Sequence, residues 1–243
     1  SMSAMRPMGR PRQARMLYYD DARHAYLYTV EPPPEELDVL HPVDVVCNSM
    51  VDTFVFGFGI GPTMSYGTRV GEIWFAGQEH HVANWRARET VLRLLEQGLD
   101  PLKMIIDRAH YHRMDFYGSL RLAASNVPVP EGQEPFDFSA AAARQERFAL
   151  IEEALSHYGV DGFELDCVFE PDSLFRPENV QQGSGIMVDF VRQVRQLVDE
   201  TARRQGRSIA LGVRVLPTLK GNTLMGLDVL AWLEEALIDF IVP

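Results

Sequence analysis

The sequence has little of what marks several large classes of protein. It contains only two cysteines, Cys47 and Cys167, among 243 residues, which excludes a disulfide scaffold and predicts two buried thiols. No uncharged apolar run approaches the roughly 18 residues that a membrane helix needs. The apolar fraction of 46% and the charged fraction of 23% are typical of a globular domain with a substantial core.

Several catalytic and cofactor-binding signatures are also missing. There is no H-E-x-x-H and no cysteine cluster, so we expect no metal ion and no cofactor. The lack of a G-x-S-x-G elbow argues against an esterase. The glycine cluster at 57–61 is not followed by a helical pattern, and we interpret it as a loop rather than a dinucleotide site. Lys103 and Lys220 lie outside the predicted inner strand faces, which argues against Schiff-base chemistry in a lyase or aldolase.

Charge is distributed unevenly along the chain. Residues 1–15 carry four arginines and no acid, so the net charge of −11 for the whole chain leaves −15 for residues 16–243. A body this acidic repels polyanions, and we expect neither a nucleic-acid nor a membrane partner. Residues 1–15 lack the apolar stretch of a secretory signal, and we interpret them either as a disordered basic leader or as residues added to the natural chain, before a single domain at 16–243.

Two hydrophobic periodicities alternate along that domain. Short apolar runs predict strands at 16–19, 43–47, 116–122, 160–169, 209–216 and 238–242, and helical spacing predicts helices at 84–97, 138–158, 186–204 and 227–236. This alternation predicts an α/β fold with parallel strands. A doubly wound sheet and the first six units of a (β/α)8 TIM barrel both fit, and the absence of a glycine motif after the first strand favours the barrel. Six strands would leave two open edges, so we expect a chain truncated at its C-terminal end.

The segment at 160–169 has the strongest functional signal. Alternate side chains of a strand share a face, so Glu164 and Asp166 point one way while Phe163, Leu165 and Cys167 point the other. The apolar set suits the helical layer, which directs the two carboxylates into the barrel near its C-terminal mouth. Mutual repulsion would raise the pKa of one acid, as a general acid requires. The alternative is a structural pair of acids held by arginines.

The same segment carries a family resemblance. Its D-G-F-E-L-D at 161–166 resembles the strand-four motif of family 18 chitinases, although Val168 stands where those enzymes carry the catalytic glutamate. The chain more closely resembles the bacterial glycoside-hydrolase-like barrels over residues 16–243, through L-Y-Y-D-D at 17–21, F-R-P at 175–177, L-G-V-R-V at 211–215 and W-L-E-E-A-L-I-D-F-I-V-P at 232–243. This resemblance implies a (β/α)8 barrel and a carbohydrate substrate. Ala123 and Ala124 replace an Asn-Asp pair expected from it.

Other polar and aromatic residues at predicted strand ends are candidate sugar contacts. The polar candidates are Asp20 and Asp21 after the first strand, Asn48 and Asp52 after the second, Arg121 on the third and Arg214 on the fifth. Arg121 and Arg214 are also expected to pair with the two acids, and Asp20 and Asp21 have the alternative role of capping a helix. Tyr66, Trp74 and Phe169 lie in predicted loops, where rings either stack on sugars or simply pack. The loop at 54–83 is long enough to suggest a binding loop.

Two hypotheses of function follow. The first is a glycoside hydrolase in which Glu164 is the general acid/base and Asp166 is its partner or electrostatic stabiliser. The second is a non-catalytic carbohydrate-binding barrel, which Val168 and the two alanines favour. Removal of a carboxylate would abolish turnover in the first case and only change affinity in the second.

Overall fold

A single, mainly parallel sheet organises the molecule. The computed structural model describes residues 13–123, 136–168 and 174–243. Its six parallel strands are β1 (Leu17–Asp20), β2 (Thr53–Ile60), β5 (Asp115–Arg121), β6 (Gly162–Asp166), β7 (Ala210–Arg214) and β8 (Phe240–Val242). Their order in the sheet is their order in the chain. A doubly wound sheet reverses direction part-way, whereas a barrel wall does not. The fold is therefore the first six strands of a (β/α)8 barrel, in a sheet that is not closed within the described residues.

The second strand lies elsewhere than the sequence predicts. The apolar run at 43–47 is the end of helix α1 (Glu36–Asp44) and the turn after it, while β2 begins at Thr53. The predicted loop at 54–83 is also wrong, because it contains β2 and the short strands β3 (Thr63–Met64) and β4 (Glu72–Ile73). The glycines of β2 serve close packing: a Cβ on Gly57 would lie 2.6 Å from the Tyr19 hydroxyl.

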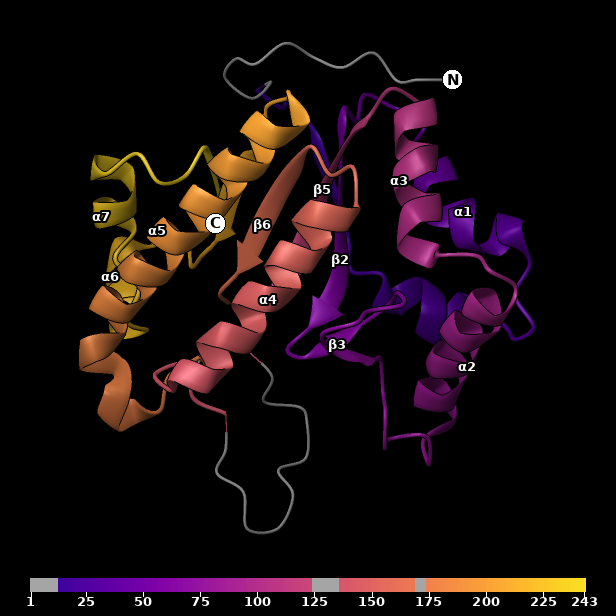
Figure 1. The fold of residues 1–243 in the computed structure, drawn as a ribbon, viewed down its shortest axis with the longest axis horizontal. Coiled ribbons are helices and arrows are strands. Elements are labelled where there is room, and N and C mark those ends of the chain that lie inside the picture. Colours follow the sequence, from indigo (N-terminus) through magenta and orange to yellow (C-terminus); the bar gives the residue numbers. More distant parts are fainter. Residues whose placement is uncertain (1–12, 124–135, 169–173) are drawn as a thin grey trace.

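Helices cover one face of the sheet (Figure 1). The longer ones are α2 (Val82–Glu96), α3 (Pro101–Tyr111), α4 (Ala141–His157) and α5 (Val180–Gln205), followed by the short α6 (Leu219–Leu224) and α7 (Val229–Glu234). Two single-turn elements, the π-helix η1 (Ala25–Thr29) and the 3-10 helix η3 (Pro177–Asn179), complete the described set. Helices α1 and α3 are absent from the sequence-based prediction. Helix α3 starts at a clear signal, since the Asp100 side chain accepts from the Leu102 and Lys103 N–H groups beside Pro101.

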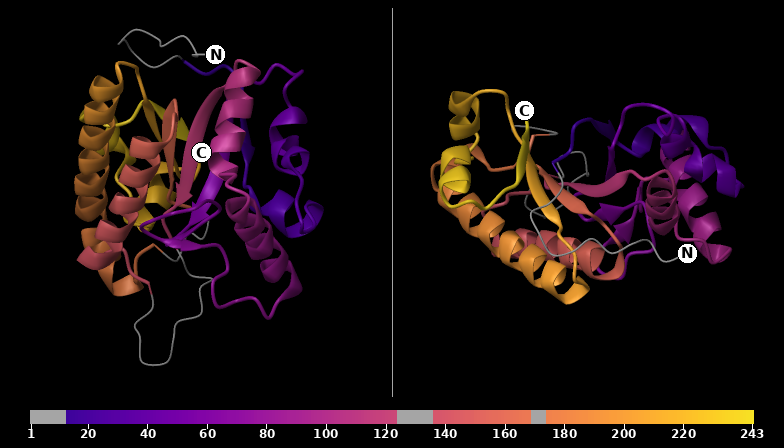
Figure 2. Two further views of the ribbon diagram at one scale, coloured as in Figure 1. Left: turned by 45° about the vertical axis from the view of Figure 1, so that its right-hand side comes forward. Right: turned by 90° about the horizontal axis from the view of Figure 1, so that it is seen from above.

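The main core fills the space between these helices and the outer face of the sheet. Phenylalanines from three strands meet there, among them Phe56, Phe116 and Phe163, each at most 1% exposed. Viewed from above, the strands curve and the helices lie on the convex side (Figure 2). The opposite, concave face has its own small cluster of Val55, Tyr117 and Ala210. Burial of the outer face therefore fixes which side chains point inward.

The two cysteines and the N-terminal segment complete the description. Cys167 is buried and Cys47 is partly buried, and both are free thiols. Of the basic leader expected at 1–15, residues 1–12 lie outside the described part of the chain. Among the described residues, no helix has the length and apolarity to cross a membrane.

Candidate active site

The inner face of the sheet is built in layers. The strand register places Tyr19, Val55, Tyr117, Gly162 and Ala210 side by side in a lower layer. The middle layer contains Ser119, Glu164, Gly212 and Phe240, and the upper layer, at the carboxyl ends of the strands, contains Arg121, Asp166, Arg214 and Val242. Polarity therefore increases from the amino end of the strands toward their carboxyl end.

Glycines make room for the rings of this face. A Cβ on Gly162 would lie 2.6 Å from the Tyr117 ring, and a Cβ on Gly212 would overlap the Phe240 ring. The two rings lie against each other with centroids 5.3 Å apart. Because side chains are missing at these two positions, the aromatic rings can fill the space across the strands beside and below Glu164.

Glu164 is fully buried at the centre of the face. Its Oε1 accepts from Ser119 Oγ at 2.8 Å, and Arg214 donates Nε to Oε1 at 3.2 Å and Nη2 to Oε2 at 3.1 Å. Burial raises the pKa of Glu164, although Arg214 and the Ser119 hydroxyl oppose that rise. Glu164 therefore holds a proton to higher pH than an exposed glutamate.

Asp166 lies one layer closer to the carboxyl edge. It is 3% exposed, and its Oδ1 accepts from the Val168 N–H at 3.0 Å. Its Oδ2 lies 3.8 Å from Arg121 Nε and 4.0 Å from Arg214 Nε. The two arginines therefore join both acids in one charged group, in agreement with the pairing expected from the sequence.

Tyr19 on β1 and Asp21, which directly follows that strand, complete this group. The Arg214 guanidinium lies over the Tyr19 ring, 4.2 Å from its centroid, and Arg121 Nη2 donates to the Tyr19 hydroxyl at 3.4 Å. Burial raises the pKa of Tyr19 to about 12. Asp21 Oδ2 lies 3.5 Å from Arg121 Nη2. The cluster thus combines three carboxylates with two guanidinium groups.

The position after Asp166 carries no acid. Val168 is partly buried and packs against the main core. The preceding thiol, Cys167, is buried, and desolvation raises its pKa. Any acid chemistry at this edge of the described sheet would therefore come from Glu164, Asp166 or Asp21.

Three polar candidates lie away from this cluster. Asp20 points to the outer side of β1, where burial raises its pKa and its Oδ1 accepts from the Ala22 N–H at 2.8 Å, so it caps a turn. Asn48 and Asp52 precede β2 and therefore lie at the amino end of the sheet. The sequence-based prediction put them at the carboxyl end because it placed the second strand at 43–47. Asn48 is exposed, and Asp52 accepts from the N–H groups of Arg15 and Met16 at 3.2 and 3.3 Å.

The aromatic candidates are core residues where the structure describes them. Tyr66 is fully buried on the outer side of the sheet, and its hydroxyl donates to Glu153 Oε2 at 3.0 Å. Trp74 is 1% exposed and donates Nε1 to the Thr63 carbonyl at 3.1 Å. Both placements correct the expectation of loop rings available to a sugar. Phe169 lies outside the described residues, as does Ala124.

Sequence reasoning missed Ser119 and Tyr19 as members of the site. Ser119 pairs in register with Glu164, and it lies two residues before Arg121 on the same face. Tyr19 likewise lies on the inner face of β1, since Tyr18 packs outward against Phe54. The alternation that assigns Glu164 and Asp166 to one face would also have found these two, once the strands were paired.

Comparisons with known proteins address the fold. No family model matches the sequence, and no curated protein matches it. Among solved structures, a cell-surface-expressed multi-modular chitinase from Paenibacillus sp. str. FPU-7 matches with a TM-score of 0.50 at 11% identity, over 93% of this chain and 23% of that one. At this identity the likeness bears on the fold alone, and it agrees with the barrel wall described above.

Two further matches involve enzymes of related description. A glycoside hydrolase family 18 N-acetylglucosaminidase from Paenibacillus barengoltzii gives a TM-score of 0.48 at 14% identity, over 94% of this chain. A class V chitinase from Pseudomonas fluorescens Pf-5 gives 0.45 at 16% identity, over 93% of this chain. The chain spans 52% of the length of each.

Proposed function

We propose that this barrel is a glycoside hydrolase acting on a poly- or oligosaccharide, with Glu164 as its general acid and Asp166 as the stabilising carboxylate. One observation carries the proposal: two carboxylates and two arginines meet at the carboxyl ends of β5, β6 and β7. Barrel enzymes bind and transform their substrates at that end.

The two acids differ in a way that suits two roles. Burial raises the pKa of Glu164, so this residue can carry the proton that a leaving glycosidic oxygen needs. In the reaction, Glu164 gives its proton to that oxygen as the C–O bond breaks. A water molecule then adds to the anomeric carbon and returns a proton to the carboxylate. Asp166, closer to the edge, stabilises the positive charge that develops on the sugar ring.

Arg214 is the group that a substrate would have to displace. Its side chain is 23% exposed while the Glu164 that it pairs with is fully buried. A sugar hydroxyl can replace a guanidinium N–H as hydrogen-bond partner of a carboxylate, and movement of Arg214 would open Glu164 to the substrate. We therefore assign Arg214 a positioning role. Arg121 would keep its ion pair with Asp166 when Arg214 moves.

Turnover measurements test the proposal. The full-length protein that contains this chain is assayed on chitooligosaccharides, α-glucans and aryl glycosides, beside Glu164→Gln and Asp166→Asn. Loss of general acid catalysis lowers kcat by about 10²–10⁴-fold. Asp52→Asn, at the opposite end of the sheet, is the matched control and should retain wild-type turnover. Equal activity in wild type and Glu164→Gln would contradict the assignment.

A second candidate function is carbohydrate binding without catalysis. It is favoured by Val168, which packs into the core at the position where the resembling chitinases carry their catalytic glutamate. Calorimetric titration with the same sugars separates the two functions. Saturable binding that survives Glu164→Gln, together with no turnover in the wild type, would support the binding barrel.

A further inference from the structure

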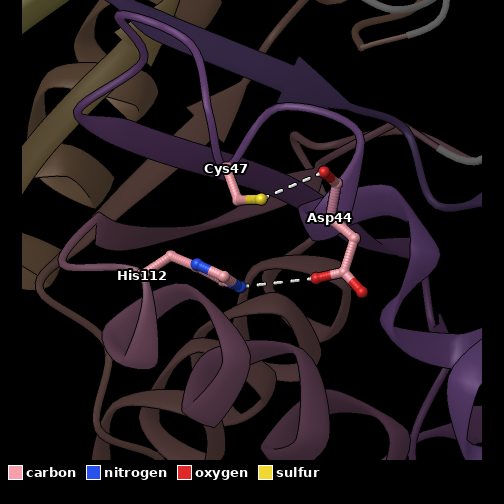
Figure 3. Close-up of side chains that lie close together, drawn as sticks. All are labelled: Asp44, Cys47 and His112. Atoms are coloured by element: carbon pink, nitrogen blue, oxygen red, sulfur yellow. Dashed lines mark hydrogen bonds and ion pairs between the residues drawn. The ribbon is translucent and has the colours of Figure 1, made fainter.

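A second cluster of chemically reactive side chains lies at the amino end of the sheet. Asp44 ends helix α1, Cys47 follows it by three residues, and His112 is the C-terminal cap of helix α3. Figure 3 shows the carboxylate, the thiol and the imidazole gathered at the junction of the two helices. Their ligand atoms all lie within 4.8 Å of one another. We propose that Asp44, Cys47 and His112 bind a zinc ion that joins α1 to α3.

The donor set is the first argument. A thiolate, an imidazole and a carboxylate together suit Zn²⁺, which takes four ligands in a tetrahedron, and a water molecule can supply the fourth. Bonds of about 2.0–2.3 Å place the ligand atoms of such a site roughly 3.3–3.7 Å apart. His112 Nε2 and Asp44 Oδ1 already lie 3.5 Å apart. Small side-chain rotations of the partly buried Cys47 would complete the geometry.

The imidazole nitrogen is the second argument. His112 Nε2 is buried, and no group in the described part of the chain forms a hydrogen bond with it. Its Nε2 lies 3.5 Å from Asp44 Oδ1, a contact that is an ion pair only if the ring carries a second proton. A buried ring nitrogen without a hydrogen bond is costly, whereas the lone pair of the neutral imidazole facing a metal ion is satisfied. The orientation of this ring therefore suits a ligand better than a free histidine.

Arg108 holds the carboxylate in place without using all of it. It donates Nε to Asp44 Oδ1 at 2.6 Å and Nη2 to Oδ2 at 3.0 Å. Each carboxylate oxygen has a second lone pair, so Oδ1 can still bind a cation. When the metal binds, the S–H bond of Cys47 breaks, its proton passes to solvent and the sulfur bonds to zinc. Asp44, Cys47 and Arg108 then sum to one negative charge, which attracts the dication.

The place of the cluster in the fold indicates its role. His112 precedes β5 and Cys47 precedes β2, so the cluster lies at the end of the strands opposite Asp166 and Arg214. In barrel enzymes that end contributes stability rather than chemistry. The ion would therefore act as a clamp between two helices, independently of any reaction at the carboxyl end. The sequence motifs for zinc could not reveal this set, because His112 is far from the other two in the chain.

Cobalt substitution tests the proposal directly. Titration of the reduced, metal-free protein with Co²⁺ is expected to saturate at one equivalent, with a near-ultraviolet thiolate-to-cobalt band and the intense visible bands of tetrahedral cobalt. Cys47→Ser should abolish the near-ultraviolet band, and His112→Gln should weaken binding at least tenfold. Cys167→Ser and His41→Gln are the matched controls and should bind as the wild type does. A band that survives Cys47→Ser, or no band at all in the wild type, would overturn the site.

A measurement on the unaltered protein covers variants that fail to fold. Cys47 is partly exposed and Cys167 is buried, so a maleimide reagent reports on Cys47 in the native state. One equivalent of Zn²⁺ is expected to slow the modification of Cys47 at least tenfold. A free Zn²⁺ concentration of 100 times the Kd is expected to raise Tm by about 5 °C or more. Unchanged labelling and Tm in the presence of zinc would contradict the proposal.

Discussion

At the amino end of the sheet, Asp52 and Asp161 accept hydrogen bonds from backbone N–H groups, whereas Glu164 near the carboxyl end accepts from the side chains of Ser119 and Arg214. A backbone donor is fixed by the fold and cannot leave. A side-chain donor can rotate away and be replaced by a ligand. Among these three acids, the two that accept from the main chain lie at the amino end, away from the candidate site, and Glu164, which accepts from two movable side chains, lies at its centre.

The largest expected effect comes from removing a side-chain donor. Arg214→Met leaves the buried Glu164 without its bidentate partner, and loss of one member of a buried pair costs about 3–5 kcal/mol. The matched change at the amino end is Arg207→Met, because Arg207 Nη1 lies 3.3 Å from Asp161 Oδ1. Asp161 keeps the Phe116 N–H and His110, so about 1 kcal/mol is expected. Urea unfolding measures both, and equal losses would break the comparison.

Filling Gly212, the glycine beside Glu164 in the middle layer, should have a smaller effect. A Cβ at Gly212 overlaps the Phe240 ring, so Gly212→Ala forces the ring or the strand to move and costs about 1–3 kcal/mol. The control is Gly185→Ala in α5, where nothing lies within 4 Å of the new atom. A helical glycine replaced by alanine gains up to about 1 kcal/mol. Thermal unfolding should therefore move in opposite directions for the two variants.

At the amino end, Asp52→Asn tests a carboxylate held by the backbone. Hydrogen bonds from Arg15 and Met16 hold the pKa of Asp52 below its ordinary value of 3.8, against the opposing effect of burial. Its charge therefore stabilises the fold above pH 3.8, and that stabilisation is lost as pH falls through the lower folded-state pKa. We expect Asp52→Asn to cost about 1 kcal/mol at neutral pH and less in acid. Denaturant unfolding at both pH values checks this, and sugar affinity should not change.

The smallest expected effect is the pH dependence that Glu164 gives to the free energy of unfolding, which has the opposite sign to that of Asp52. Burial raises the pKa of this acid above its ordinary value of 4.5, so the folded state binds the proton more tightly than the unfolded state does. Stability contributed by that proton is complete below pH 4.5 and declines as pH rises through the folded-state pKa. Glu164→Gln should remove the decline. A series of unfolding midpoints between pH 4 and 8 that has the same slope in both proteins would contradict this.

The sequence predicted the inner face more successfully than the strands that lead to it. Strict alternation in β6 assigned Glu164 and Asp166 to one face, because Phe163 and Leu165 could only face the helices. The run at 43–47 was ambiguous, since a few apolar residues fit a strand or one side of a helix equally well. The glycines of β2 resembled a loop because their purpose, the close approach of Tyr19, depends on a neighbouring strand.

The positions of candidate sugar-binding residues were harder to predict for the same reason. Tyr66 and Trp74 are large rings near glycines, and only the tertiary structure shows that a helix covers them. Asp52 was assigned to the wrong end of the sheet because its strand was misplaced by about ten residues. Ser119 was overlooked because a serine in an apolar strand has no signal until its partner across the sheet is known.

The paired rings of Tyr117 and Phe240 have a consequence for proton traffic. Phe240 lies in the same layer as Glu164 and Tyr117 in the layer toward the amino end, and Gly162 and Gly212 let the two rings pack tightly. Among the described partners of this fully buried carboxyl, Arg214 is partly exposed, so we expect solvent protons to reach Glu164 past its guanidinium. The rate at which Glu164 gains or loses its proton then depends on how often the Arg214 side chain rotates away. The motion of this one side chain would therefore limit hydrogen isotope exchange at the centre of the barrel.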